Sequence, residues 1–230
     1  IMKYPESVVA TARIMRHVGA DWTFRLDGYE ATNFGLLTGD AAAQKELTLK
    51  IIHAAVACGA RVVVLPECGH AYTALRWMGA NMYGKPLPFK VMHIAEFLAE
   101  QVRAGKLRLR KVGKTATFHD PCQIVRRGGL EAAARRVLAA LGFKLVELED
   151  HGLTGFCCGG GGGVVSNLRA APLRAGVFEM KRQQVDATGA KRLVTSCGQC
   201  RITLETGARN AKWDKPVESL LELVADNLAD

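Results

Sequence analysis

The sequence predicts an α/β protein built from two tandem Rossmann-like repeats, each with its own parallel sheet. Apolar segments of strand length alternate with segments of helical periodicity. Strands separated by helices favour parallel sheets with right-handed crossovers. This order of segments occurs twice along the chain, and cysteines and glycines follow the predicted strands of the second copy. Ligands bind at that edge of an open parallel sheet, so the pattern indicates a binding site there.

The second half shows the alternation most clearly. We expect strands at 115–118, 144–148 and 192–195, and helices at 130–141, 171–188 and 216–228. Pro172 suits the first turn of the helix expected at 171–188. A backbone N–H in that turn would have no partner within the helix, so proline loses nothing by lacking one.

The first half repeats this order, with helices expected at 5–18, 41–58 and 91–102 and strands at 21–25 and 61–65. One alignment of the halves places Cys68 on Cys200, and another places Asn33-Phe34 on Cys157-Cys158. The two alignments differ because repeats tolerate loops of different length. A counterpart of the strand at 115–118 would precede Ile1. We therefore expect a truncated first repeat at 1–112, a second repeat at 113–230, and a chain that is a piece of a longer protein.

Composition limits the classes of function. With 49% hydrophobic residues, the 230-residue chain is expected to fold around a substantial core. Its net charge is +9, but Lys and Arg are scattered instead of forming a basic stripe with aromatic residues. We therefore expect no nucleic-acid partner, and either an acidic protein partner or an anionic membrane surface instead. Cysteines in a long α/β chain indicate reduced thiols and a cytoplasmic location.

Five of the seven cysteines form a distinctive pattern. They are Cys122, Cys157, Cys158, Cys197 and Cys200, and each group follows a predicted strand. Thiolates select iron–sulfur clusters, zinc or copper(I). Zinc remains an alternative, although an adjacent pair suits tetrahedral zinc poorly and five thiolates exceed what one zinc needs. The glycines at 159–163 lack the Lys-Ser/Thr of a phosphate-binding loop, and their missing side chains leave room for a bulky inorganic core.

The motifs Asp120-Pro-Cys122, Gly155-Phe-Cys-Cys-Gly159 and Ser196-Cys-Gly-Gln-Cys200 resemble the cysteine-rich CCG domain. That family occurs in heterodisulfide reductase catalytic subunits and in iron–sulfur subunits of glycolate and lactate oxidation. The resemblance covers both halves. It implies a noncubane [4Fe-4S] cluster on the five cysteines, which binds and reductively cleaves a disulfide. Asn33, Phe34 and Leu65 depart from the tandem pattern, which argues against a second such cluster.

Further segments resemble the DsrK-type subunits of sulfite-reduction-associated membrane complexes, which are similar to the D-type catalytic subunits of heterodisulfide reductases. These segments are Tyr4–Ala10, Gly28–Gly35 and Pro66–Tyr72. The resemblance implies a ferredoxin-like domain with cubane clusters, membrane-complex subunits as partners, and a small sulfur-carrier protein of the DsrC type as thiol substrate.

Residues outside the five cysteines are candidates for catalysis. Cys68 and His70 follow the strand at 61–65 and are expected to line the cluster or the substrate path; a relic cysteine packed at a strand end is the alternative. His119 precedes Asp120 and is a candidate proton donor, since histidine titrates near neutral pH; a hydrogen-bonding histidine at a strand end is the alternative. Cys58 is expected in the core.

The sequence therefore predicts an iron–sulfur thiol–disulfide oxidoreductase of dissimilatory sulfur metabolism. The alternative is an electron-transfer subunit of a hydroxyacid-oxidising complex, in which a flavin partner carries out the substrate chemistry.

Overall fold

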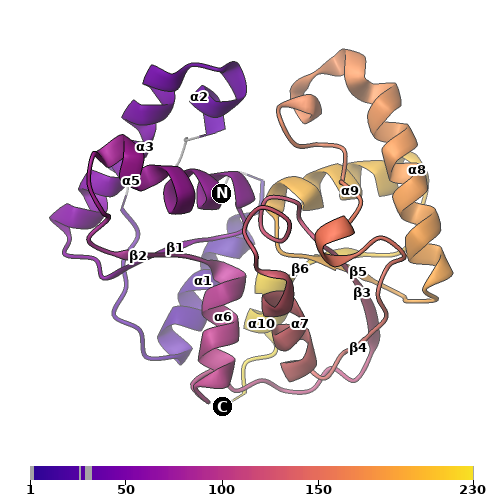
Figure 1. Ribbon diagram of the computed structural model, residues 1–230. Coiled ribbons are helices and arrows are strands. Elements are labelled where there is room, and N and C mark those ends of the chain that lie inside the picture. Colours follow the sequence, from indigo (N-terminus) through magenta and orange to yellow (C-terminus); the bar gives the residue numbers. More distant parts are fainter. Residues whose placement is uncertain (1–2, 26, 29–32, 230) are drawn as a thin grey trace.

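The structure is a computed structural model that describes residues 3–25, 27–28 and 33–229. Two parallel sheets lie side by side, one in each half of the chain (Figure 1). The predicted mixed α/β fold with parallel sheets is confirmed. The predicted boundary at residue 112 lies in the segment between the two sheets and stays a prediction.

The second half contains a four-stranded sheet in the order β4-β3-β5-β6. Its strands are β3 (Thr115–His119), β4 (Lys144–Leu145), β5 (Leu193–Thr195) and β6 (Val217–Ser219). Its helices are α7 (Glu131–Ala140), α8 (Ala171–Ala187), α9 (Gly198–Asn210) and α10 (Leu220–Asp226). All pairings are parallel, so the loops that follow β3 and β5 leave the sheet at the same edge.

The first half contains a two-stranded parallel sheet of β1 (Val62–Leu65) and β2 (Lys90–His93). Its helices are α1 (Pro5–His17), α2 (Asn33–Thr38), α3 (Ala41–Ala57), α4 (Gly69–Thr73), α5 (Gly79–Tyr83) and α6 (Ile94–Arg103). A turn of π-helix at Ala74–Met78 joins α4 to α5. The side chains of Asn33 and Phe34, predicted to replace a cysteine pair, lie outside the described part of the chain.

The two halves repeat one series of elements, because β1, α4, β2 and α6 correspond to β5, α9, β6 and α10. In each half the last helix begins directly after a strand. His93 Nδ1 accepts a hydrogen bond from the Ala95 N–H at 3.2 Å, and Ser219 Oγ accepts one from the Glu222 N–H at 3.2 Å. Each of these N-cap residues marks the beginning of its helix, so both helices begin a few residues after the predicted position. The helices predicted at 91–102 and 216–228 were therefore wrong over their first residues, which form β2 and β6.

Four helices bury a core that the two halves share. Helix α6 packs against α7, and α1 packs against α10; in Figure 1 these helices lie together below the sheets. Ile14, Leu98, Val137 and Val224, one from each helix, are fully buried in the same cluster. The seam between the halves is therefore part of the hydrophobic core.

Two further predictions differ from the structure. Residues 21–25 are irregular and exposed, not a strand; Trp22 and Phe24 stack edge-to-face at 5.1 Å instead of pairing with β1 or β2. Cys58 ends α3 as an exposed residue, not a core residue, and its thiol donates to the Ala55 carbonyl at 3.4 Å.

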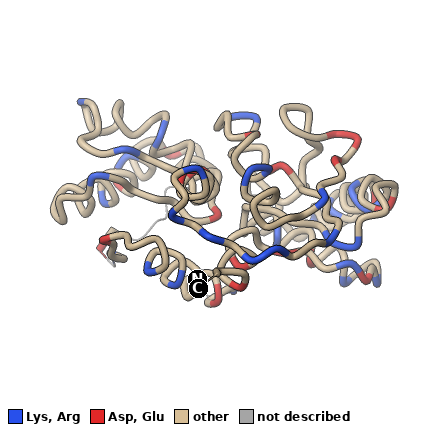
Figure 2. The backbone as a smooth tube through the Cα atoms, turned by 90° about the horizontal axis from the view of Figure 1, so that it is seen from below, with Lys and Arg blue, Asp and Glu red and all other residues tan. Residues whose placement is uncertain are grey.

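Lys and Arg lie on both halves in the view of Figure 2, without gathering over one of them. No helix among the described residues is both long and apolar enough to cross a bilayer.

Candidate metal centre

Five cysteines occupy three segments at one edge of the four-stranded sheet. Cys122 follows β3, and Cys197 and Cys200 lie at the start of α9, directly after β5. Cys157 and Cys158 lie in the connection between β4 and α8. Cys158, Cys197 and Cys200 are buried, Cys122 is half-buried, and Cys157 is exposed. The group therefore has a buried side and an open side.

The five thiols form a continuous series of side-chain interactions. Cys122 interacts with Cys157, Cys157 with Cys158, Cys158 with Cys200, and Cys200 with Cys197. The sulfur atoms of Cys158 and Cys200 lie within 4.8 Å of each other. The structure thus brings together all five cysteines that the sequence singled out.

These contacts divide the thiols into two electrostatic groups. Interactions with Cys122 and Cys158 lower the pKa of Cys157 to about 2, and interaction with Cys200 lowers the pKa of Cys197. The pKa values of Cys122, Cys158 and Cys200 are raised, mainly because their thiols interact with neighbouring cysteines. The lowered pKa values therefore belong to Cys157 and Cys197, which are separated in the series by Cys158 and Cys200. A bound metal would favour the thiolate form of all of them.

Backbone N–H groups add to the stabilisation of sulfur charge. The Gly159 N–H donates to Cys157 Sγ at 3.3 Å, and the Gly160 N–H lowers the pKa of Cys158. The N–H groups of Cys200, Gln199 and Gly69 lower the pKa of Cys197. Such N–H groups are typical of sites where hydrogen bonds tune sulfur ligands.

The first two glycines after the cysteine pair, Gly159 and Gly160, are required by packing against helices. Gly159 has a φ of +81°, and a Cβ there would lie 2.8 Å from Val177 on α8. A Cβ on Gly160 would overlap the hydroxyl of Thr203 on α9. The backbone of this loop consequently packs closely against both helices, which places its N–H groups on the cysteines.

His119 lies on the buried side of the cysteine group. One of its ring nitrogens lies within 4.8 Å of the sulfurs of Cys158 and Cys200, and neither nitrogen has a hydrogen-bond partner in the described structure. Burial, with a smaller contribution from Lys181, lowers the pKa of His119 to about 3. The ring is therefore neutral near pH 7, which differs from the near-neutral titration expected from the sequence. Buried polar atoms normally have a hydrogen-bond partner. Ring nitrogens of His119 that lack one, beside the cysteine group, therefore suit a site that binds a metal group.

The loop that carries Cys68 and His70 lies against all three cysteine segments. The Glu67 carbonyl accepts from the Gly198 N–H at 2.9 Å, and a Cβ on Gly69 would lie 2.7 Å from that of Gln123. A Cβ on Gly161 would lie 3.8 Å from the His70 ring. The first half therefore covers part of the cysteine group.

Cys68 corresponds to Cys197, and not to Cys200 as the sequence alignment predicted. Cys68 is the N-cap of the helix that follows β1, and Cys197 is the N-cap of the helix that follows β5. The Ala71 N–H donates to Cys68 Sγ at 3.5 Å, as the Cys200 N–H interacts with Cys197. Ala71 therefore occupies in the first half the position of Cys200.

An ion pair to the buried carboxylate of Asp120 fixes the segment that leads to Cys122. Arg135 on α7 donates to both carboxylate oxygens of Asp120, at 2.9 and 2.8 Å, and to Glu147 at 2.7 Å. Asp120 also accepts from the Gly152 N–H at 2.6 Å. The network ties the β3 loop to the segment that precedes the cysteine pair. The Asp-Pro-Cys motif singled out Asp120 in the sequence, but nothing in the sequence indicated that Arg135 would belong to the network.

A second polar network joins the halves behind Cys68. Glu67 has a φ of +45° and is buried. Its carboxylate accepts from Ser219 at 2.7 Å and from Ser7 at 3.2 Å, and burial raises its pKa. Ser7 also donates to Glu222 at 2.8 Å. The residue next to Cys68 is thus held by α1 and by the junction of β6 and α10.

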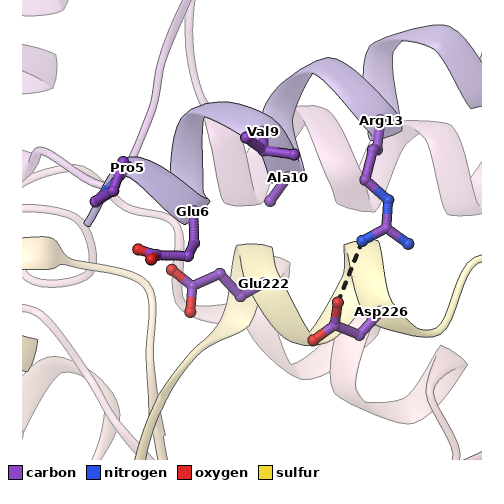
Figure 3. A pocket seen from close by; sticks show the side chains of 7 residues that line it. All are labelled: Pro5, Glu6, Val9, Ala10, Arg13, Glu222 and Asp226. Carbon is purple, nitrogen blue, oxygen red and sulfur yellow. Dashed lines mark hydrogen bonds and ion pairs between the residues drawn. The ribbon is translucent and has the colours of Figure 1, made fainter.

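Two cavities open near the seam between the halves. The larger, of about 490 Å³, lies between α1 and α10 and is lined by Glu6, Arg13, Glu222 and Asp226 among others (Figure 3). Arg13 pairs with Asp226 at 3.3 Å, and the cavity has no cysteine or histidine in its lining.

The smaller cavity, of about 230 Å³, is lined by Leu36, Thr73, Trp77, Met78 and Arg127. Thr73 ends α4, the short helix that Cys68 caps. Arg127 comes from the loop that follows Cys122, so both halves contribute to this cavity.

Comparison with known proteins identifies the domain that contains the cysteine group. Residues 116–205, which include all five cysteines, match the cysteine-rich domain named CCG. The chain carries a CCG domain over these residues. It is 34% identical over 227 residues to the D subunit of the dihydromethanophenazine:CoB--CoM heterodisulfide reductase of Methanosarcina mazei, across 95% of this chain and 54% of that protein. The chain thus spans about half the length of this curated relative.

Two other relatives match a smaller part of the chain. The chain is 32% identical over 158 residues to the EtfAB:quinone oxidoreductase of Syntrophomonas wolfei, across 66% of this chain and 22% of that protein. It is 32% identical over 143 residues to the probable iron-sulfur-binding oxidoreductase FadF of Bacillus subtilis, across 60% of this chain and 20% of that protein.

Proposed function

We propose that this CCG-domain protein is an iron–sulfur oxidoreductase that exchanges electrons with a thiol–disulfide substrate. The observation that carries the proposal is the continuous group of five thiols, delivered by three segments to one edge of the sheet. We propose that Cys122, Cys157, Cys158, Cys197 and Cys200 hold a noncubane [4Fe-4S] cluster. When bound, such a cluster supplies electrons one at a time.

The chain's own residues have separate roles in this proposal. Cys158, Cys197 and Cys200 anchor the cluster from the buried side, and N–H groups from the glycine loop and from Gly69 stabilise charge on sulfur. Exposed Cys157 and half-buried Cys122 face the open side, where the substrate would approach. His119 lies on the opposite, buried side and would orient the cysteines that it approaches.

The substrate is proposed to reach the site between the halves, past Cys68 and His70. The cavity beside α4 supports this path, because its lining combines the apolar side chains of Trp77 and Met78 with the positively charged Arg127. This combination suits a partner that carries a carboxylate next to an apolar group, such as the tail of a small sulfur-carrier protein of the DsrC type.

The reaction balances as one disulfide, two electrons and two protons giving two thiols. The electrons would come from a ferredoxin-like domain or partner with cubane clusters. The relative named as part of a heterodisulfide reductase supports this direction. A place in dissimilatory sulfur metabolism, on the cytoplasmic face of a membrane complex, belongs to the same proposal.

A second function is favoured by the relative named as a quinone oxidoreductase. In that case the chain relays electrons, and the substrate chemistry belongs to another protein, as in a hydroxyacid-oxidising complex.

One experiment separates the two functions. The anaerobically reconstituted chain, reduced by a low-potential dye, is mixed with a protein disulfide of the sulfur-carrier type, and free thiols are counted. Two thiols per two electrons consumed, lost in Cys157→Ser, support the reductase. Dye oxidation by a quinone analogue with no thiols formed from any disulfide supports the relay and contradicts the reductase.

A further inference from the structure

Lys181 is a buried cation close to the cysteine group. It lies on α8, and only 1% of its surface is exposed. Its Nζ lies 5.6 Å from the centre of the Phe156 ring, and Phe156 directly precedes Cys157. Its hydrogen bond to Gln184 Oε1 is a long one, at 3.5 Å. Residues this buried are rarely lysine unless a charge compensates the ammonium.

No carboxylate lies within ion-pair distance of Lys181 in the described part of the chain, whereas Lys215 and Lys90 have carboxylates at 2.7 and 2.8 Å. The two acidic residues whose charge acts on Lys181 are Asp150 and Asp120. Each already has a nearer partner.

Asp120 is paired with Arg135 at 2.8 Å, and Asp150 accepts from Gln184 Nε2 at 2.6 Å. Burial accordingly lowers the pKa of Lys181 to about 8. An ammonium so buried and so weakly compensated is costly in the protein alone.

The remaining negative charge that Lys181 faces is that of the cysteines. Lys181 interacts electrostatically with Cys158 and Cys157 and with His119, whose ring lies beside Cys158 and Cys200. Lys181 and His119 therefore lie on the buried side of the group, where water does not screen their interactions with it.

We propose that Lys181 is the buried counter-charge of the cluster held by the five cysteines, a positioning residue that sets the reduction potential of that cluster. The inference rests on the proposed function, because the counter-charge requires the cluster. A cluster held by thiolates is anionic, and each electron added increases its negative charge. A fixed positive charge in a poorly screened site stabilises the reduced form more than the oxidised form. Lys181 thus raises the potential.

The test uses Lys181→Met, which keeps the length of the side chain and removes its charge. Iron and sulfide content and the midpoint potential are measured on the anaerobically reconstituted chain, the potential by an EPR-monitored redox titration. We expect unchanged cluster content and a midpoint potential clearly more negative than that of the wild type. Lys181→Arg, which retains the charge, is expected to stay close to the wild type. The control is Lys191→Met, which removes an exposed lysine just beyond α8, and should leave the potential unchanged.

A second measurement uses the cluster-free chain. If the ammonium is compensated mainly by the cluster, Lys181→Met has a higher Tm than the wild type without the cluster. A lower Tm would show that protein groups compensate Lys181 and would overturn the inference. A full cluster in both proteins with equal potentials would also overturn it, while leaving the proposed function intact. A wild-type chain that binds no iron and sulfide would refute the proposed function, and the inference with it.

Discussion

The two halves of the molecule share the order of their strands and helices, yet five of the seven cysteines belong to the second. At the matching strand ends, Cys68 is the N-cap residue of α4 and Cys197 is the N-cap residue of α9. Three residues later the first half has Ala71 and the second has Cys200. The junction between strand and helix therefore determines where the cysteine sulfur lies in both halves. Whether a metal group can bind at that position depends on the additional cysteines nearby, which only the second half has.

The largest expected effect concerns the adjacent pair. Cys158 interacts with both Cys157 and Cys200, so Cys158→Ser and Cys157→Ser should each remove or rearrange the cluster. Iron and sulfide analysis with EPR spectroscopy would measure the loss. Cys58→Ser, at an exposed site on the first half, is the control and should retain full cluster content. Equal loss in all three variants would contradict the assignment of the pair as ligands.

The matched caps provide a direct comparison of the halves. Cys197→Ser should lose most of the cluster, whereas Cys68→Ser should keep it, because a serine hydroxyl caps α4 as well as the thiol does. The same iron and sulfide assay applies to both. Loss of iron in Cys68→Ser, with its helix content unchanged by circular dichroism, would show that the first half supplies a ligand.

Breaking an ion pair in the second half should lower the free energy of unfolding more than breaking one in the first half. Arg135→Met leaves the carboxylate of Asp120, whose side chain is 1% exposed, buried without its charged partner. Breaking such a pair costs about 3 kcal/mol. Lys90→Met breaks the exposed pair with Glu100 in the first half and should cost less than about 1 kcal/mol. Urea denaturation of the cluster-free, reduced chain measures both, and equal costs would contradict the structural role of the Asp120 network.

The helix caps His93 and Ser219 should differ in their response to pH. Burial lowers the pKa of His93 to about 3, below the value of about 6.5 in the unfolded chain. Protonation therefore favours the unfolded state, and stability is lost as the pH falls below about 6.5. Between pH 7 and pH 5 this group costs about 2 kcal/mol.

His93→Ser gives α6 the kind of cap that α10 has, and should remove that part of the pH dependence. Urea denaturation at pH 5 and pH 7 compares it with the wild type. The same loss of stability in both proteins over this range would contradict the depressed pKa of His93.

The sequence predicted the elements whose pattern is local. Helices such as α1 and α7 have clear apolar periodicity, and the strands β1, β3 and β5 are short runs rich in β-branched residues. The sequence pattern did not predict the boundaries of elements where a polar residue sets the boundary. His93 and Ser219 end a strand and cap a helix in one step, and periodicity does not show such a junction. Asp21–Arg25 has the alternation of a strand but no neighbouring strand to pair with among the described residues.

The cysteines of the candidate site were predictable because thiolates are few and strand ends of a parallel sheet converge. The residues behind them were not. Lys181 and Arg135 lie on helices distant in sequence from the cysteines, and a lysine or arginine in a helix ordinarily indicates a solvated face. Their burial follows from tertiary packing, which the sequence pattern does not encode.

The central claim is that the second half holds an iron–sulfur cluster on five cysteines. Metal and labile-sulfide analysis of the anaerobically reconstituted chain, together with EPR spectroscopy after partial oxidation, tests it most directly. The account predicts about four irons and about four sulfides per chain, with an EPR signal that Cys158→Ser abolishes or alters. Tightly bound zinc without sulfide, or full iron incorporation in the Cys158→Ser variant with an unchanged signal, would contradict it.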